Sequence, residues 1–152
     1  MVQNELFKIA EVSISYRPIV DMMTRPVVTS SESAFEIFRQ SWDLGRISFL
    51  EEFKVLLLNR ANKVLGVVNL SVGGVSGTVV DPKVLFVTAL KANCSSVILC
   101  HNHPSGNLDP SEADFKLTKR LVECGKLLNI LVWDHLIISD SSYLSFADEG
   151  FL

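Results

Sequence analysis

The sequence predicts an α/β fold in which helices pack against the faces of one mixed sheet, and two observations support this prediction. The second half of the chain alternates short apolar runs with amphipathic helical patterns, which is typical of parallel strands joined by helices. The first half holds two apolar runs on either side of a short polar turn, which predicts an antiparallel hairpin. A sheet that contains both kinds of pairing is mixed.

The chain of 152 residues has the length of one domain, which we expect over residues 31–152 after a lead-in of residues 1–30. Apolar residues in the lead-in predict one extended segment over residues 9–16, and Pro18 and Pro26 interrupt the chain after it. The first helix is predicted to begin after a serine cap, at Ser30 or Ser31. Its apolar positions are Ala34, Phe35, Phe38 and Trp42.

The hairpin is predicted from a strand over residues 53–58, a turn over residues 59–62 and a return strand over residues 64–70. Residues 71–80 are rich in Gly, Ser and Val. They predict either a bulged strand or an irregular loop.

Asp81 and Pro82 predict the start of the second helix, with Asp as N-cap and Pro in the first turn. Its predicted apolar stripe consists of Val84, Leu85, Thr88 and Ala89, and Asn93 is expected to end it. A further helix is predicted over residues 111–129, with Leu117, Leu121, Cys124 and Leu128 on one face. The strands expected in this half cover residues 97–100, 131–138 and 143–146.

The composition is that of an ordinary globular protein, since 48% of the residues are hydrophobic and 20% are charged. The formal net charge of -3 gives no support to binding of duplex DNA, which usually requires a basic surplus. Three cysteines without paired spacing argue against a disulfide framework and favour a reducing compartment. The sequence shows neither a signal-peptide pattern nor an apolar run long enough to cross a membrane, so we expect a cytoplasmic protein.

The chemistry is expected around His101 and His103, which come directly after a predicted buried strand. In extended backbone, residues two apart project to the same side, so both imidazoles can converge on one metal ion. Residues 104–106 (Pro-Ser-Gly) then turn the chain sharply. Asp114 lies in the first turn of the next helix and can point back toward the histidines. Three protein ligands with one open position are typical of catalytic zinc, which generates hydroxide near neutral pH.

A hydrolytic zinc site also needs a general base and a donor for the developing oxyanion. Ser111 is the candidate donor, and Glu51 or Glu52 is the candidate base. Ser111 and Asp114 have a second explanation, because Ser-x-x-Asp before an apolar helix resembles a capping box. Capping and metal binding are expected to compete for the carboxylate of Asp114.

Three other polar residues near the histidines are interpreted from strand alternation. Asn102 is expected to point away from the two histidines and to have a supporting or structural role. Asp134 and His135 are expected on opposite faces of their strand, where either support of the site or simple packing explains them equally well.

The segment ILCHNHPSGNLDPSEADFKLTKRL, together with EEFKVLLLN and LVWDHLII, resembles the RadC branch of the JAMM (MPN+) metalloprotease superfamily. The shared pattern is His-x-His, seven residues, Ser, two residues and Asp, with an upstream Glu, and the resemblance covers roughly the last two thirds of the chain. It implies a three-layer α/β/α, cytidine-deaminase-like fold, a Zn²⁺ ion held by His101, His103 and Asp114, and an oxyanion stabilised by Ser111. It assigns the base to Glu51 rather than Glu52.

The resemblance implies a zinc-dependent hydrolase that cleaves a peptide or isopeptide bond in a peptide or protein substrate. One alternative is a DNA-repair-associated accessory protein without catalysis, as in the name RadC. Against it, the net charge is acidic, and the helix-hairpin-helix-like segment that precedes the domain in full-length relatives is not recognisable here. A second alternative is an inactive site used for binding, which ranks last because every motif position is filled. The sequence identifies neither the substrate nor the oligomeric state.

Overall fold

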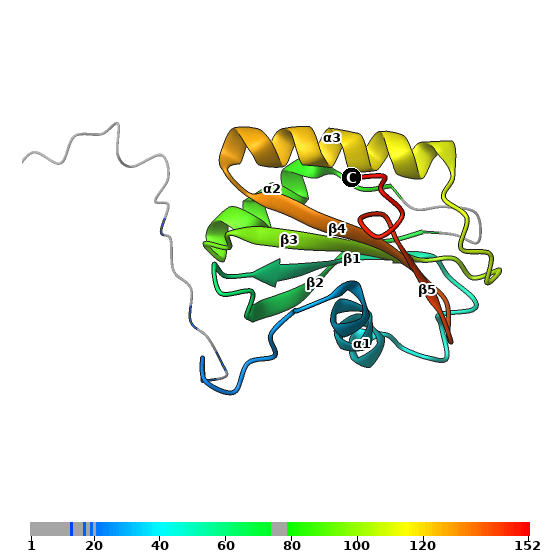
Figure 1. Cartoon of the computed structure of the whole chain (residues 1–152), viewed down its shortest axis with the longest axis horizontal. Coiled ribbons are helices and arrows are strands. Elements are labelled where there is room, and N and C mark those ends of the chain that lie inside the picture. The colour runs from blue at the N-terminus through cyan, green and yellow to red at the C-terminus, as the bar shows by residue number, and fades with distance from the viewer. Residues whose placement is uncertain (1–12, 14–16, 18, 20, 74–78) are drawn as a thin grey trace, which may run out of the picture.

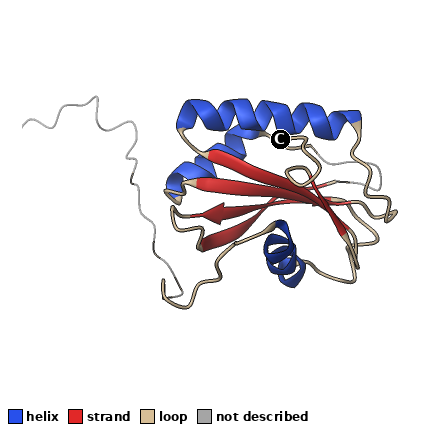
Figure 2. Cartoon of the chain, viewed as in Figure 1, coloured by secondary structure: helices blue, strands red, loops and turns tan. Residues whose placement is uncertain are grey.

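The computed structural model describes residues 13, 17, 19, 21–73 and 79–152. The described elements are three helices and five strands, in the order α1 (Ser31–Ser41), β1 (Glu52–Leu58), β2 (Val64–Val72), α2 (Pro82–Lys91), β3 (Ser96–Asn102), α3 (Glu112–Leu128), β4 (Leu131–Ile138) and β5 (Tyr143–Ser145). Figure 2 shows the strands of the central sheet between the helices.

The five strands form one sheet in the order β2-β1-β3-β4-β5. Strand β1 pairs antiparallel with both β2 and β3, and β5 pairs antiparallel with β4. Strands β3 and β4 are parallel and are joined by α3. Helix α1 lies on one face of the sheet, whereas α2 and α3 cover the other (Figure 1). The predicted mixed sheet and three-layer α/β/α fold are therefore confirmed.

Alternation along β1 divides the interior into two cores. Phe53, Val55 and Leu57 pack on the side of α2 and α3. Leu56 and Leu58 face the other way and pack with the apolar side chains of α1. Both faces of β1 are covered, so the strand is buried along its whole length and has the continuous apolar run of an interior strand.

Most predicted helix termini are confirmed. Ser30, one of the two serines considered, caps α1 and accepts a hydrogen bond from the Ser33 backbone N–H. Asp81 caps α2 by accepting from the Lys83 backbone N–H, and Pro82 occupies the first turn. Helix α3 ends at Leu128, and its C-cap Asn129 adopts the left-handed conformation (φ 55°), which Asn tolerates better than most residues.

The predicted apolar stripes of α2 and α3 need correction. Phe86 rather than Val84 joins Leu85 and Ala89 in the core, and Val84 is 49% exposed. Burial of a phenyl ring is more favourable than burial of a valine side chain. The buried face of α2 therefore includes Phe86 and differs from the predicted stripe. In α3, Leu128 is 42% exposed, and Gly125 is buried in the last turns instead.

Two predictions concern segments that are only partly described. The stretch of residues 71–80 begins as the end of β2, and residues 74–78 lie outside the described residues. The extended segment expected over residues 9–16 also lies outside them, apart from residue 13. The end of the lead-in is placed, because Val27 forms an isolated antiparallel bridge to Lys63, the residue before β2.

Among the described residues, no helix has the length and apolar character that a membrane span requires. Cys94 and Cys100 are buried, Cys124 is half-buried, and all three are free thiols.

Candidate metal centre

Strand β3 carries the first histidine to the end of the sheet. His101 pairs with Phe53 of β1, and its ring lies parallel to the phenyl ring at an interplanar angle of 4° with centroids 5.9 Å apart. Alternation therefore turns His101 toward the face covered by α2 and α3, where it is 1% exposed. Asn102, the next residue, points to the opposite face, as predicted.

A tight turn directs the second histidine toward the first. The Gly106 backbone N–H donates to the His103 carbonyl oxygen over 3.0 Å, and Gly106 adopts φ +82°, which favours glycine. The ring of His103 is fixed through Nδ1, which donates to the carbonyl oxygen of Asn107. A carbonyl oxygen can only accept, so Nε2 is the atom that His103 offers to the site.

The first turn of α3 supplies the carboxylate. Ser111 is the N-cap, and its Oγ accepts from the Asp114 backbone N–H over 3.1 Å. In return, Asp114 Oδ2 accepts from the Ser111 backbone N–H over 2.8 Å. In this structure the same carboxylate caps the helix and faces the histidines, because Oδ1 lies near His101 while Oδ2 accepts from the cap.

The three side chains converge on one point. His101 Nε2 lies 3.0 Å from His103 Nε2 and 3.2 Å from Asp114 Oδ1, and His103 Nε2 lies 3.6 Å from Asp114 Oδ2. Ligand atoms around a tetrahedral zinc ion are separated by about 3.3 Å, given zinc–ligand distances of roughly 2.0–2.1 Å. Two imidazoles and a carboxylate thus fit one divalent metal ion. In the described part of the chain, this is the one group of three or more His, Cys, Asp or Glu residues that meets such a criterion.

The charges at the centre support the same interpretation. Burial raises the pKa of the Asp114 carboxyl, but the hydrogen bonds with His101 and His103 outweigh it, so its pKa lies well below the usual range. The hydrogen bond with Asp114 raises the pKa of His103, against the opposing effect of burial. An anionic carboxylate thus attracts a cation between the imidazoles. A bound metal ion would take the place of the proton that the raised pKa of His103 favours at this site.

A second row of buried side chains stands behind His101. His101 Nδ1 lies 2.8 Å from His135 Nε2, and His135 Nδ1 lies 2.6 Å from Thr118 Oγ1. Burial lowers the pKa of His135 well below its usual value, so this ring is neutral. The sequence left the role of His135 open and gave no role to Thr118 or to the carbonyl of Asn107. Thr118 lies one helical turn after Asp114 in the sequence, and this spacing could have predicted that it lies near the site.

The two glutamates considered as a base have different surroundings. Glu52 is buried on the α1 side, where it forms ion pairs with Arg46 (3.0 Å) and Lys54 (3.9 Å). Glu51 is half-buried and precedes Phe53 by two residues, which favours the face that carries His101. Its charge also contributes to the raised pKa of His103, after the larger effects of Asp114, burial and Asn107.

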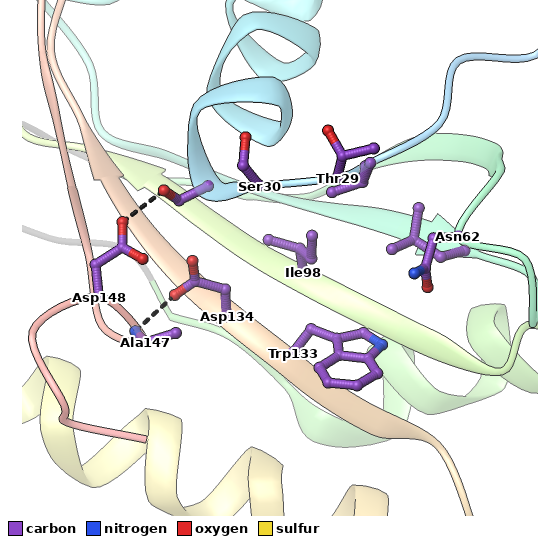
Figure 3. Close-up of a pocket in the computed structure, with 11 residues that line it drawn as sticks. Thr29, Ser30, Asn62, Ile98, Trp133, Asp134, Ala147 and Asp148 are labelled. Carbon is purple, nitrogen blue, oxygen red and sulfur yellow. Dashed lines mark hydrogen bonds between the residues drawn. The ribbon is translucent and has the colours of Figure 1, made fainter.

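A separate pocket lies on the other face of the sheet, between the start of α1, β4 and the loop after β5. Figure 3 shows Trp133, Asp134 and Asp148 around it. Its two carboxylates are already bound within the protein, Asp134 by the Ala147 backbone N–H and Asp148 by the Ser31 hydroxyl. This pocket of about 220 Å³ includes none of the three converging side chains.

Comparison with known proteins places these features in a family context. The family model described as "RadC-like JAB domain" matches residues 28–151. A UPF0758 protein of Flavobacterium johnsoniae is 44% identical over 130 residues, which are 86% of this chain and 56% of that protein. A UPF0758 protein of Staphylococcus carnosus is 39% identical over 135 residues, covering 88% of this chain and 58% of that protein. The chain spans about half the length of the curated relatives it matches.

Proposed function

This chain belongs to the RadC-like JAB domain family, and on that premise we propose that it is a zinc-dependent hydrolase of the JAMM type that cleaves a peptide or isopeptide bond. The observation that carries the proposal is the convergence of His101 Nε2, His103 Nε2 and the Asp114 carboxylate at the end of β3. Domains of the JAB/MPN superfamily are typically hydrolytic, and the UPF0758 names of the relatives assign no activity.

The donor set favours zinc. Structural zinc sites are usually closed by four ligands, often cysteines, whereas catalytic sites combine three protein ligands with one open position. The proposed ligands are two histidines and one aspartate, and the free cysteines Cys94, Cys100 and Cys124 are not part of the group. When bound there, zinc would lower the pKa of a coordinated water to roughly 7 and polarise a carbonyl group.

We assign the general base to Glu51. Its carboxylate would accept a proton from the attacking water and then give that proton to the leaving amine as the C–N bond breaks. The alternation of β1 and the electrostatic effect on His103 support this assignment. Glu52 is a poorer candidate because its carboxylate is bound by Arg46 and Lys54 on the far face.

We assign Ser111 the role of stabilising the oxyanion that develops on the substrate carbonyl. Its Oγ already accepts from the Asp114 backbone N–H, so the O–H remains the donor for an oxygen at the site. The adjacent helix N-terminus adds partial positive charge, which favours the same negative oxygen. Capping and oxyanion stabilisation then use opposite sides of one hydroxyl group.

The substrate is proposed to be a peptide or protein, because this chemistry suits an amide carbonyl. The test uses zinc-loaded protein, a pool of linear and lysine-branched peptides, and water enriched in heavy oxygen. Hydrolysis incorporates the label into each new carboxyl terminus, and mass spectrometry detects it. The Glu51→Gln variant should bind zinc as the wild type does and produce no labelled termini.

The matched control is Glu52→Gln, which changes the neighbouring carboxylate on the opposite face. We expect it to retain labelled products, with any loss following its effect on stability. Equal loss in both glutamate variants would remove the basis for assigning the base to Glu51. A zinc-loaded wild type that labels no peptide in the pool would count against peptide hydrolysis.

A further inference from the structure

Four groups form a continuous buried chain of hydrogen bonds behind the metal centre. Thr118 Oγ1 lies 2.6 Å from the Asp114 carbonyl oxygen and 2.6 Å from His135 Nδ1. His135 Nε2 lies 2.8 Å from His101 Nδ1. Thr118, His135 and His101 are all 2% exposed or less, so these hydrogen bonds are shielded from bulk water.

The Asp114 carbonyl oxygen determines the direction of every hydrogen bond in this series. The Asp114 carbonyl oxygen can only accept, so the Thr118 hydroxyl donates to it. Thr118 Oγ1 then accepts from His135, which must carry its proton on Nδ1. A neutral imidazole has a single N–H, so His135 Nε2 is bare and accepts from His101 Nδ1. Once a metal ion replaces the proton that His101 Nε2 shares with Asp114, His101 is neutral and its Nε2 is bare as well.

The surroundings of His135 hold its ring in place. Phe146 stacks on it with centroids 4.8 Å apart and an interplanar angle of 29°, and Phe53 contacts it edge-on at 5.5 Å. An apolar environment of this kind disfavours a charged imidazolium. A neutral His135 that donates to Thr118 through Nδ1 therefore accepts from His101 Nδ1 through Nε2.

We propose that Thr118 and His135 are positioning residues that hold His101 in the one neutral tautomer whose Nε2 lone pair faces the metal. The inference rests on the proposed function, because it takes His101 Nε2 as a metal ligand. A neutral histidine has two tautomers, and only one of them can ligate through Nε2. Groups that fix the tautomer of a ligating histidine typically change metal affinity by 10–100-fold when removed.

The tautomers can be read directly from the wild-type protein. The chain contains three histidines, all of them at this site, so a long-range proton–nitrogen NMR spectrum has three pairs of ring nitrogens to assign. At about pH 8, where a histidine with an ordinary pKa is neutral, we expect His135 to carry its proton on Nδ1 and to have a bare Nε2. The metal-free protein suffices for this measurement. A proton on His135 Nε2 would overturn the inference.

The variant Thr118→Val removes the hydroxyl and nearly preserves the shape. We expect its zinc affinity, measured by competition with a chromophoric chelator, to fall by about 10–100-fold. Thr118→Ser restores the hydroxyl and should return the affinity to within about threefold of the wild type, well short of the loss expected from removing the hydroxyl. The matched control is Thr88→Val, since Thr88 makes the same i to i−4 bond to the Val84 carbonyl in α2, outside the hydrogen-bonded chain of the site.

The outcomes separate this inference from the proposed function. A wild type that binds zinc, with Thr118→Val binding it equally well, overturns the positioning role and leaves the hydrolase proposal intact. A wild type that binds no zinc contradicts the proposed function, and the tautomers of the metal-free protein still decide the inference. If Thr118→Val fails to fold, the wild-type spectrum alone decides it.

Discussion

The Oδ1 atom of Asn102 accepts a hydrogen bond from the Glu52 backbone N–H over 2.7 Å. This bond joins the end of β3, between the two converging histidines, to the segment that carries Glu51. The Nδ2 atom of Asn102 donates to the carbonyl oxygens of Ile47 and Leu50, each over 2.7 Å. One fully buried amide therefore fixes the position of the proposed base relative to the proposed ligands.

Asn102→Ala should lower the free energy of unfolding by about 3 kcal/mol, because it leaves buried backbone groups without partners. Urea unfolding of the metal-free protein measures the loss. The control is Asn59→Ala, which removes a side chain that accepts from the Ala61 and Lys63 backbone N–H groups in the hairpin turn. Those groups can reach water, so we expect a loss of only about 1 kcal/mol. Equal losses of unfolding free energy in the two variants would contradict the claim that burial makes the hydrogen bonds of Asn102 more important for stability.

Two substitutions of Ser111 should separate capping from catalysis. Ser111→Ala removes the cap and should cost about 1 kcal/mol of stability, whereas Ser111→Gly should cost only a few tenths. Both lack the O–H donor, and loss of an oxyanion donor typically lowers turnover by about 10²–10³-fold. Thermal unfolding and the heavy-oxygen assay measure the two effects. If the loss of turnover in each variant matches its loss of stability, so that Ser111→Gly is nearly as active as the wild type, the role of Ser111 is purely structural.

The predictable parts of this structure are those encoded locally. Ser30, Asp81 and Ser111 precede apolar helical patterns, and each caps the next helix in the chain. The spacing of His101 and His103 determines that both project to one face, because alternation in a strand depends only on sequence distance.

The missed parts depend on tertiary contacts. Thr118 meets His135 only because α3 packs across the parallel pair formed by β3 and β4. The burial of Phe86 in place of Val84 depends on how α2 rotates on the sheet. Asp114 caps α3 and faces His101 at the same time because its two carboxylate oxygens have different partners, and a sequence motif contains no such geometry.

Gly125→Ala should destabilise the fold although alanine favours helices. A Cβ at this position would lie 2.3 Å from the backbone carbonyl oxygen of Ile130, so α3 would have to move away from the start of β4. Such overpacking typically costs about 1–3 kcal/mol, against a propensity gain of at most about 1 kcal/mol. Chemical unfolding measures the difference. Gly66→Ala, where no atom lies within 4 Å of the added Cβ, should not destabilise the protein, and equal losses in both variants would contradict the packing argument.

Two buried thiols should make stability fall in alkaline solution. Burial raises the pKa of Cys94 to about 11 and the pKa of Cys100 well above the ordinary value of 9.0. Both thiols ionise first in the unfolded chain, so their contribution is fully present below pH 9.0 and is lost as pH rises above it.

The expected slope is about 1.4 kcal/mol per pH unit for each thiol. Urea unfolding in reducing buffer between about pH 8 and 11 measures it, on either side of the ordinary cysteine pKa. Cys94→Ala should give a shallower decline than the wild type, because one of the two thiols no longer titrates. Parallel curves for the two proteins would show that Cys94 ionises equally in the folded and unfolded states.

The zinc content of the purified protein tests the central claim most directly. After removal of metal with a chelator, dialysis against zinc and elemental analysis, the wild type should hold about one zinc ion per chain, as expected for a single three-ligand site. The His101→Ala, His103→Ala double variant should hold almost none, since one carboxylate alone cannot retain the ion. A double variant that keeps more than about half of the wild-type zinc would contradict the ligand set, and with it the function proposed for this chain.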